Sequence, residues 1–150
     1  MAAAWASPWS SRCPLPDGVG ITQAALDIIA AHARSEHPRE CCGLLVGTTQ
    51  AILKAVPVEN VAADPFRRFE IAPAAYVAEI RRCREQGGEV VGAYHSHPLS
   101  APEPSPTDQE MAFSDFIFVI AGPVTERRDV DVRAYVLRDG ALAELTLAAI

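Results

Sequence analysis

Hydrophobic positions recur with a helical period in two segments of the chain. In the first, residues 22–37, Thr22 is a candidate N-cap, Pro38 ends the pattern, and one helical face carries Ala25, Leu26, Ile29 and Ala33. The second begins at Pro73, a residue that suits the first turn of a helix, and ends at the glycine pair 87–88. Each segment is therefore predicted to be a helix.

Short apolar or β-branched runs between turn residues predict strands in much of the remaining chain. The runs cover residues 41–47, 51–59, 66–73, 89–97, 115–122, 131–140 and 141–150. The first two are expected to form a hairpin, and Asp139-Gly140 is a strong turn signal before the last run. Ser105 and Asp108 fit the N-cap and N3 positions of a short helical turn. This order of elements predicts an α+β fold, with a mixed β-sheet flanked by helices.

The composition fits one folded domain. With 150 residues, 49% of them hydrophobic, the chain can bury a core of its own. Residues 1–19 are rich in Ala, Ser and Pro without a periodic pattern, which predicts a flexible N-terminal lead-in before a domain that covers residues 20–150. No apolar run is long enough to span a membrane.

Charge and cysteine content exclude several classes of protein. A net charge of −6 argues against a nucleic-acid-binding protein, which needs a basic surface. The local exceptions are two arginine pairs, which fit solvated faces or, as the alternative, a docking patch for an acidic partner: Arg67/Arg68 and Arg81/Arg82. The N-terminus is a poor signal peptide, and no C-x-x-C pair occurs among Cys13, Cys41, Cys42 and Cys83. We therefore expect a cytoplasmic protein with reduced thiols and with neither nucleic acid nor membrane as a partner.

The segment 94–110, YHSHPLSAPEPSPTDQE, carries the main chemical signal. Residues i and i+2 of a strand point to the same face, so His95 and His97 project together. Two neutral imidazoles placed in this way can both bind zinc at about 2.0–2.1 Å. The proline-rich loop that follows lets the chain turn back and makes Asp108 the candidate third ligand. Three protein ligands leave the fourth tetrahedral position for water, as in catalytic zinc sites.

Two other carboxylates are alternatives to Asp108 as the third ligand. The competing interpretation is that the two histidines have a structural role and bind no metal. Glu103 lies between prolines and is expected to face solvent, whereas Asp115 is expected to open the next strand. Histidines at a strand end can also be plain hydrogen-bonding residues. The combination of H-x-H, a proline-rich loop and an aspartate favours the metal site.

These residues resemble the JAMM/MPN+ zinc metalloprotease family, whose motif is a distant Glu followed by H-x-H-x7-S-x2-D. His95, His97, Ser105 and Asp108 match every spacing of that motif. The segment HPRECCGLLVG is similar to the family's P-x-E-x-C-G-L-L-x-G element, which makes Glu40 the match for the distant Glu. The resemblance extends from about residue 21 to the end of the chain.

The resemblance implies a three-layer, cytidine-deaminase-like fold and a role for each matched residue. His95, His97 and Asp108 would hold one Zn²⁺ per chain, which lowers the pKa of its bound water from 15.7 towards about 7. Glu40 would act as the general base from outside the ligand shell, and Ser105 would donate to the oxyanion. A deaminase itself would need H-x-E and P-C-x-x-C, and the sequence has neither.

The short chain is most similar to the stand-alone prokaryotic members of the family. That similarity implies hydrolysis of a peptide or isopeptide bond after the Gly-Gly tail of a ubiquitin-like sulfur-carrier protein of the MoaD/ThiS type, with release of cysteine or of a C-terminal extension. The alternatives are a catalytically silent MPN-type interaction scaffold and a RadC-like domain. Exposed edges of a small mixed sheet would allow a homodimer. Whether Cys42 lies near the metal stays open.

Overall fold

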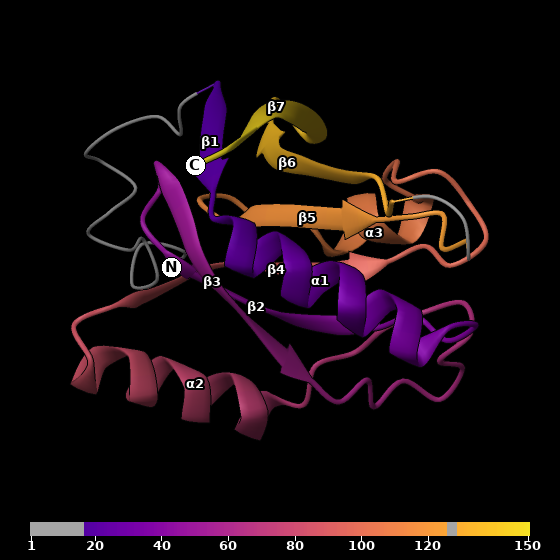
Figure 1. Cartoon of the computed structure of the whole chain (residues 1–150), viewed down its shortest axis with the longest axis horizontal. Helices are drawn as coiled ribbons and strands as arrows, with labels where there is room; N and C mark the ends of the chain where they lie inside the picture. Colours follow the sequence, from indigo (N-terminus) through magenta and orange to yellow (C-terminus); the bar gives the residue numbers. More distant parts are fainter. Residues whose placement is uncertain (1–16, 126–128) are drawn as a thin grey trace.

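The computed structural model describes residues 17–125 and 129–150, which form helices around a sheet (Figure 1). The helices are α1 (Gln23–Glu36), α2 (Pro73–Glu85) and α3 (Pro106–Met111). The strands are β1 (Gly18–Ile21), β2 (Cys42–Gly47), β3 (Ala51–Val58), β4 (Glu89–Ser96), β5 (Ile117–Ala121), β6 (Val132–Arg138) and β7 (Ala141–Ala149).

The helices begin where the local sequence signals predict. The Oγ1 atom of Thr22 accepts a hydrogen bond from the backbone N–H of Ala25, which caps α1. Helix α2 begins at Pro73, whose fixed φ angle suits a first helical turn. Ser105 is the N-cap of α3. The three predicted helices are therefore confirmed.

The described strands form one mixed sheet that closes on itself. Its order is β1-β3-β2-β4-β5-β6-β7, and β7 pairs with β1. Neighbouring strands are antiparallel except in the pairs β1–β3, β1–β7 and β4–β5. The closure is partial, because β3 pairs with β1 only at Ala51 and Ile52, and β7 pairs with β6 over residues 141–145 and with β1 over residues 146–149. The homodimer expected from exposed strand edges stays a prediction.

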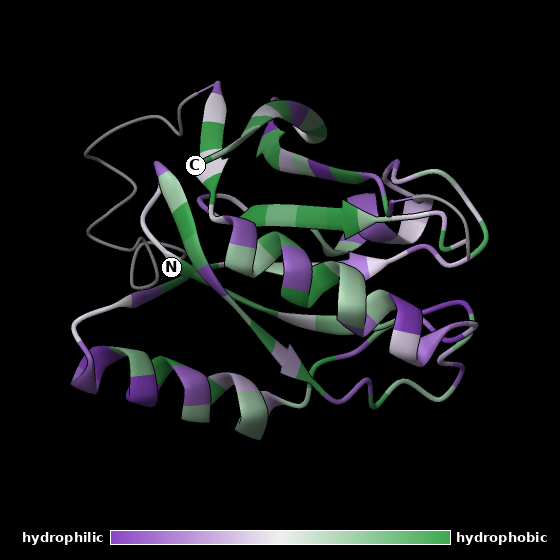
Figure 2. Ribbon diagram, viewed as in Figure 1, coloured by the Kyte–Doolittle hydropathy of each residue, from purple (hydrophilic) through white to green (hydrophobic). Residues whose placement is uncertain are grey.

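Helices cover both faces of β2, so the predicted mixed sheet flanked by helices is confirmed. Leu45 lies in the same buried cluster as Ile29 of α1, whereas its neighbour Leu44 lies in a second cluster with Tyr76 of α2. Because successive strand residues point to opposite faces, α1 and α2 pack on opposite sides of this strand. Figure 2 shows strand β5, which pairs with β4 and β6, hydrophobic along its length, as burial on both faces requires.

Two expectations about strands are wrong. The segment 66–73, predicted to be a strand, forms turns and irregular structure up to residue 72, with an isolated bridge between Asn60 and Ile71, and its last residue, Pro73, begins α2. Strand β1 was not predicted, and it begins at Gly18, inside the segment assigned to the lead-in. Its sequence, GVGI, is too short and too rich in glycine to signal a strand. Residues 1–16 of the lead-in lie outside the described residues, and the flexibility of that segment stays a prediction.

No helix among the described residues has the length and apolar character that a membrane crossing needs. Cys41, Cys42 and Cys83 are buried and form no disulfide among the described residues. Cys13 lies outside the described residues, and the cytoplasmic location stays a prediction.

Candidate active site

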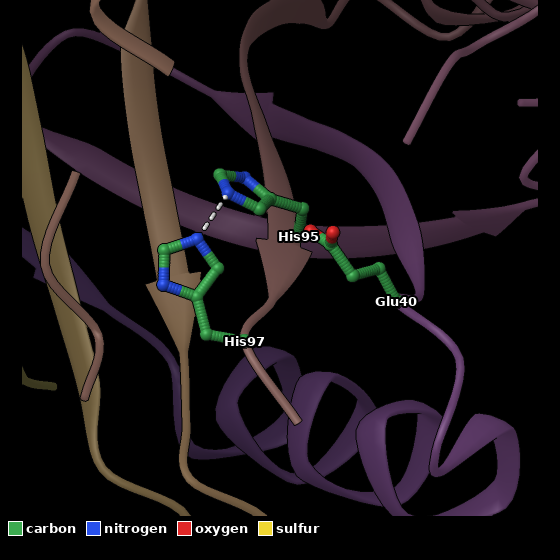
Figure 3. A group of neighbouring side chains, drawn as sticks. All are labelled: Glu40, His95 and His97. Atoms are coloured by element: carbon green, nitrogen blue, oxygen red, sulfur yellow. Dashed lines mark hydrogen bonds between the residues drawn. The ribbon is translucent and has the colours of Figure 1, made fainter. Parts of the chain in front are cut away.

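The end of β4 and the start of α3 bring the predicted metal ligands together. Nε2 of His95 lies 3.2 Å from Nε2 of His97 and 3.1 Å from Oδ1 of Asp108. Nε2 of His97 lies 3.1 Å from Oδ2 of the same carboxylate. The three side chains are only 4%, 10% and 9% exposed, in the order His95, His97, Asp108. Figure 3 shows the two imidazoles turned towards each other.

Backbone contacts hold His97 in place just beyond the end of β4. Its N–H donates to the carbonyl of Ala121 at 2.8 Å, which extends the parallel pairing of β4 with β5. A methyl group on Gly122 would overlap the carbonyl oxygen of His97, so only glycine leaves room for this close approach. The position of the second histidine therefore depends on the packing of β5 as well as on its own strand.

A capping box orients the Asp108 carboxylate. Oγ of Ser105 accepts a hydrogen bond from the N–H of Asp108 at 3.1 Å, and Oδ2 of Asp108 accepts one from the N–H of Ser105 at 2.8 Å. The predicted N-cap and N3 positions are thus confirmed. The Ser105 hydroxyl uses only acceptor capacity in this box, so its own O–H stays able to donate elsewhere.

Glu40 reaches the same site from the segment before β2. One ligand atom from each of Glu40, His95 and His97 lies within 4.8 Å of the others, and Figure 3 shows the Glu40 side chain extending towards His95. The backbone N–H of Glu40 donates to the carbonyl of Pro65 at 2.8 Å, and its carbonyl accepts from Nδ2 of Asn60 at 2.9 Å. The catalytic candidate is thus fixed through its backbone by the loop that follows β3.

Burial raises the pKa of Glu40 to about 7, an effect that the charge of His97 opposes and the charge of Asp108 reinforces. A carboxyl group with this pKa can both accept and return a proton near neutral pH. The residue is 6% exposed, so its proton exchange takes place in a largely desolvated setting.

The two histidines differ in their electrostatic environment. Burial lowers the pKa of His95 despite the contact with Asp108, which favours the neutral imidazole that metals bind. Burial also lowers the pKa of His97, but hydrogen bonds to Asp108 and to the carbonyl of Ala101 raise it more, so the net shift is upward. Burial raises the pKa of Asp108, yet its hydrogen bonds with both histidines outweigh burial and keep the pKa well below its ordinary range.

The side chains of His95, His97 and Asp108 fit a zinc ion in both their chemistry and their spacing. Two imidazole nitrogens and a carboxylate oxygen form a donor set typical of catalytic zinc sites. Ligand atoms bound at about 2.0–2.1 Å around a tetrahedral zinc lie about 3.3 Å apart. The Nε2 atoms of the two histidines lie 3.2 Å apart, and each lies 3.1 Å from an oxygen of Asp108, Oδ1 for His95 and Oδ2 for His97. In addition, Nδ1 of His97 lies 3.1 Å from the carbonyl oxygen of Ala101, and an N–H at Nδ1 leaves Nε2 free as the ligand atom.

The site opens into a cleft of about 760 Å³. Its walls carry six aromatic side chains: Phe66, Phe69, Tyr76, Phe113, Phe116 and Phe118. The Phe69 ring stacks on the His95 imidazole with centroids 4.3 Å apart and planes 18° apart. Arg67 and Arg68 lie on the same wall, in the loop that also holds the backbone of Glu40. A mostly apolar cleft with a few convergent polar groups is the usual form of a substrate site.

Comparison with known proteins identifies the family. Residues 22–136 match Prok-JAB, the prokaryotic homologs of the JAB domain. The chain belongs to this family. The resemblance to stand-alone prokaryotic JAMM/MPN+ proteins is thereby confirmed.

Three curated relatives of this JAMM domain are named for cleavage. The desampylase of Haloferax volcanii is 40% identical over 106 residues, 66% of this chain and 76% of the relative. The probable TtuB-protein conjugate cleaving protease of Thermus thermophilus is 29% identical over 80% of this chain and 76% of its own. The CysO-cysteine peptidase of Mycobacterium tuberculosis is 29% identical over 79% of this chain and 82% of its own. The chain is accordingly an enzyme of the JAMM peptidase type, as predicted.

The fold is shared with a solved JAMM structure, described as a metalloprotease-like zinc site in the proteasome and signalosome. That structure aligns over 87% of this chain and 98% of its own, with a TM-score of 0.52 and 23% sequence identity. The likeness confirms the fold predicted from the sequence.

The alternative residues of this JAMM domain lie away from the cleft. Neither Glu103, which is 4.0 Å from Arg133 and 71% exposed, nor Asp115 lines the cleft. Cys42 pairs with His95 across β2 and β4, but its thiol points to the carbonyl of Val58 at 3.9 Å. Burial raises the pKa of Cys42 to about 12, so it is an inert buried thiol.

Sequence reasoning missed the loop between β3 and α2. Asn60 bonds the backbone of Glu40, and Phe69 stacks on His95, yet residues 66–73 were expected to form a strand. Asparagine after a strand is a common turn signal and carries no information about a partner 20 residues away.

Proposed function

We propose that this JAMM enzyme uses one zinc ion, held by His95, His97 and Asp108, to hydrolyse a peptide or isopeptide bond after the Gly-Gly tail of a ubiquitin-like or sulfur-carrier protein. The observation that carries the proposal is the meeting of these three ligands with Glu40 in one cleft. The names of the relatives that cleave CysO-cysteine and TtuB-protein conjugates support the class of substrate.

The residues of this chain supply the proton transfers and the orientation. A bound zinc ion would supply Lewis acidity and a water molecule of lowered pKa. Glu40 accepts a proton from the attacking water and delivers it to the leaving nitrogen as the C–N bond breaks. The hydroxyl of Ser105 donates to the carbonyl oxygen under attack. The products are a free Gly-Gly carboxylate and a free amine, so the atoms of one water molecule are shared between them.

A tail of two glycines suits the depth of this site. His95 is 3% exposed and the Phe69 ring stacks on its imidazole, so the ring covers one side of the site at the bottom of the cleft. Glycine brings no Cβ, and a Gly-Gly segment can therefore approach more closely than a chain with side chains.

The test is intact mass spectrometry of a ThiS-type carrier protein extended beyond its Gly-Gly end and incubated with the zinc-loaded enzyme. The expected result is loss of the extension, leaving a Gly-Gly terminus, and a chelator should prevent it. Glu40→Gln should bind zinc as the wild type does but fail to cleave. Glu89→Gln, an exposed change on β4, is the matched control and should cleave normally.

Two results would contradict the proposal. Cleavage at the wild-type rate by Glu40→Gln would exclude Glu40 as the general base. Failure of the wild type to cleave the carrier with one zinc bound per chain would reject the substrate class.

A further inference from the structure

We infer that Arg67 and Arg68 bind the free α-carboxylate of the leaving group, so that the preferred substrate carries a single amino acid beyond the Gly-Gly tail. The inference rests on the proposed function and goes further, because it separates release of one residue from cleavage of an isopeptide bond to a lysine of another protein.

The position of Glu40 decides on which side of the site the leaving group lies. The residue that returns the proton must contact the leaving nitrogen, so the leaving group sits beside Glu40. The backbone of Glu40 is bonded to Pro65 and to Asn60, in the loop between β3 and α2. This loop therefore forms the wall that faces the leaving group.

Asn60 makes that wall rigid and fixes Arg68 within it. Its Nδ2 donates to the carbonyls of Glu40 and Arg68, at 2.9 Å each. Its Oδ1 accepts from the N–H groups of Ala62 and Glu70, at 3.0 Å each. All four hydrogen bonds that an amide side chain can make are thus formed. The carbonyls of the general base and of Arg68 share one side-chain amide group.

Two further contacts hold the Arg68 backbone in this position on the wall of the cleft. Its N–H donates to the carbonyl of Asp64 at 3.0 Å, and the next residue, Phe69, stacks on His95. The Arg68 backbone is therefore tied on one side to Glu40 and on the other to the metal ligand. Both Arg67 and Arg68 line the cleft that holds these residues.

The charges of the two arginines are available to a ligand. Arg82, Arg133 and Arg138 each pair with a carboxylate within 3.2 Å. Within residues 17–125 and 129–150, by contrast, neither Arg67 nor Arg68 forms an ion pair. Apart from the histidines, they are the cationic residues that line the cleft. A guanidinium group matches a carboxylate with two parallel hydrogen bonds, which makes arginine the side chain suited to this anion.

The chemistry of the leaving group then separates the two substrate types. In a single released amino acid, the carboxylate is attached to the same Cα as the leaving nitrogen, so it lies next to Glu40. A lysine side chain released from an isopeptide bond has a neutral alkyl chain at that place. Only the first substrate brings an anion to the arginines.

The experiment compares two forms of one probe, a ThiS-type carrier protein ending in Gly-Gly-Cys. One form has the free C-terminal carboxylate, and the other has a C-terminal amide made by ligation. We expect the zinc-loaded wild type to cleave the acid with a kcat/KM roughly 10- to 100-fold higher than the amide, the range for a hydrogen bond to a charged group. The double variant Arg67→Gln/Arg68→Gln should bring this ratio close to one. Arg81→Gln with Arg84→Gln removes the same charge from exposed positions on α2 and should keep the wild-type ratio.

The outcomes distinguish the inference from the function on which it rests. Equal cleavage of acid and amide by the wild type would overturn the inference and leave the proposed function standing. Cleavage of neither probe would reject the proposed function itself. A double variant that slows both probes equally, with unchanged zinc content and circular dichroism, would show that the arginines contact the carrier protein rather than the carboxylate, and would also overturn the inference.

Discussion

A methyl group placed on Gly43 would overlap the ring of Tyr94, which lies directly opposite in the pairing of β2 with β4. The tyrosine is fully buried, and its hydroxyl lies 2.8 Å from Nδ1 of His32 on α1. Gly43, which follows Glu40 on the way into β2, and Tyr94, which precedes His95 on β4, thus pack directly against each other next to the site.

Substitution of Gly43 by Ala should therefore destabilise the protein by about 1–3 kcal/mol, the usual cost of overpacking a core. Urea denaturation of the variant measures this difference. In a Tyr94→Leu background the ring is gone, and the same substitution should cost less. An equal cost of Gly43→Ala in both backgrounds would show that the ring is not the obstacle.

Replacement of Glu40 by Gln should stabilise the metal-free protein at high pH. The pKa of Glu40 is about 7 in the fold against an ordinary value of 4.5. Between these values the folded chain keeps a proton that the unfolded chain has released, so the stability of the wild type falls as the pH rises. The side-chain amide of the Glu40→Gln variant does not titrate. Its gain in the free energy of unfolding over the wild type should therefore reach at most about 3 kcal/mol above pH 7.

Urea denaturation of the metal-free proteins at pH 4.5 and pH 8 measures this gain. It should be present at pH 8 and small at pH 4.5. A gain of the same size at both values would contradict the raised pKa, and Glu89→Gln serves as the exposed control.

The proposed catalytic role of Ser105 can be separated from its structural role as the N-cap of α3. Ser105→Ala removes the cap of α3 and should cost about 1 kcal/mol of stability, and removal of the donor to the oxyanion should lower kcat by about 10²–10³-fold. Glu110→Gln, an exposed change in the same helix at a residue that does not line the cleft, is the control. Kinetics together with urea denaturation measure both quantities. A kcat that falls no more than tenfold would remove Ser105 from the catalytic group.

Tyr135 ties the proline-rich loop to β6. Its hydroxyl donates to the carbonyl of Pro102 at 2.7 Å in a buried setting. Tyr135→Phe leaves the carbonyl of Pro102 without its partner, so it should lower the free energy of unfolding by about 1–3 kcal/mol. It should also weaken zinc binding, because the proline-rich loop leads to the proposed ligand Asp108. Titration with a competing chelator measures the affinity. Tyr76→Phe is the control, because the Tyr76 hydroxyl forms no hydrogen bond within the described chain. Equal zinc affinity of both variants would show that the loop holds its position without Tyr135.

The parts of the site that the sequence predicts are those that depend on neighbouring residues. The i, i+2 rule places both histidines on one strand face, and the Ser105–Asp108 pair follows from capping. Glu40 is different, because its pairing with the histidines is long-range and rests on the resemblance to a family motif. The loop from Asn60 to Phe69 could not be predicted, because its conformation depends on hydrogen bonds to distant backbone groups, about which periodicity carries no information.

Strand β1 illustrates the same limit in the fold. Four residues with two glycines have no strand preference of their own, and pairing with β3 and β7 supplies the order. The closed sheet was therefore unpredictable from local pattern, although each of its longer strands was predicted.

The pairing of β1 with β7 also bears on how the chain folds. Gly18 lies opposite Thr146, and the N–H of Ile150 donates to the carbonyl of Ile21. The entropy lost on closing a loop grows with its length, so this contact is the most costly in the sheet to form. Hairpin β2–β3 needs only a short turn. We therefore expect the sheet to close late in folding, after the strands around the catalytic groups have paired. We expect the speed of folding to depend on the meeting of β1 with β7, whereas the proposed chemistry depends on none of the residues that pair there.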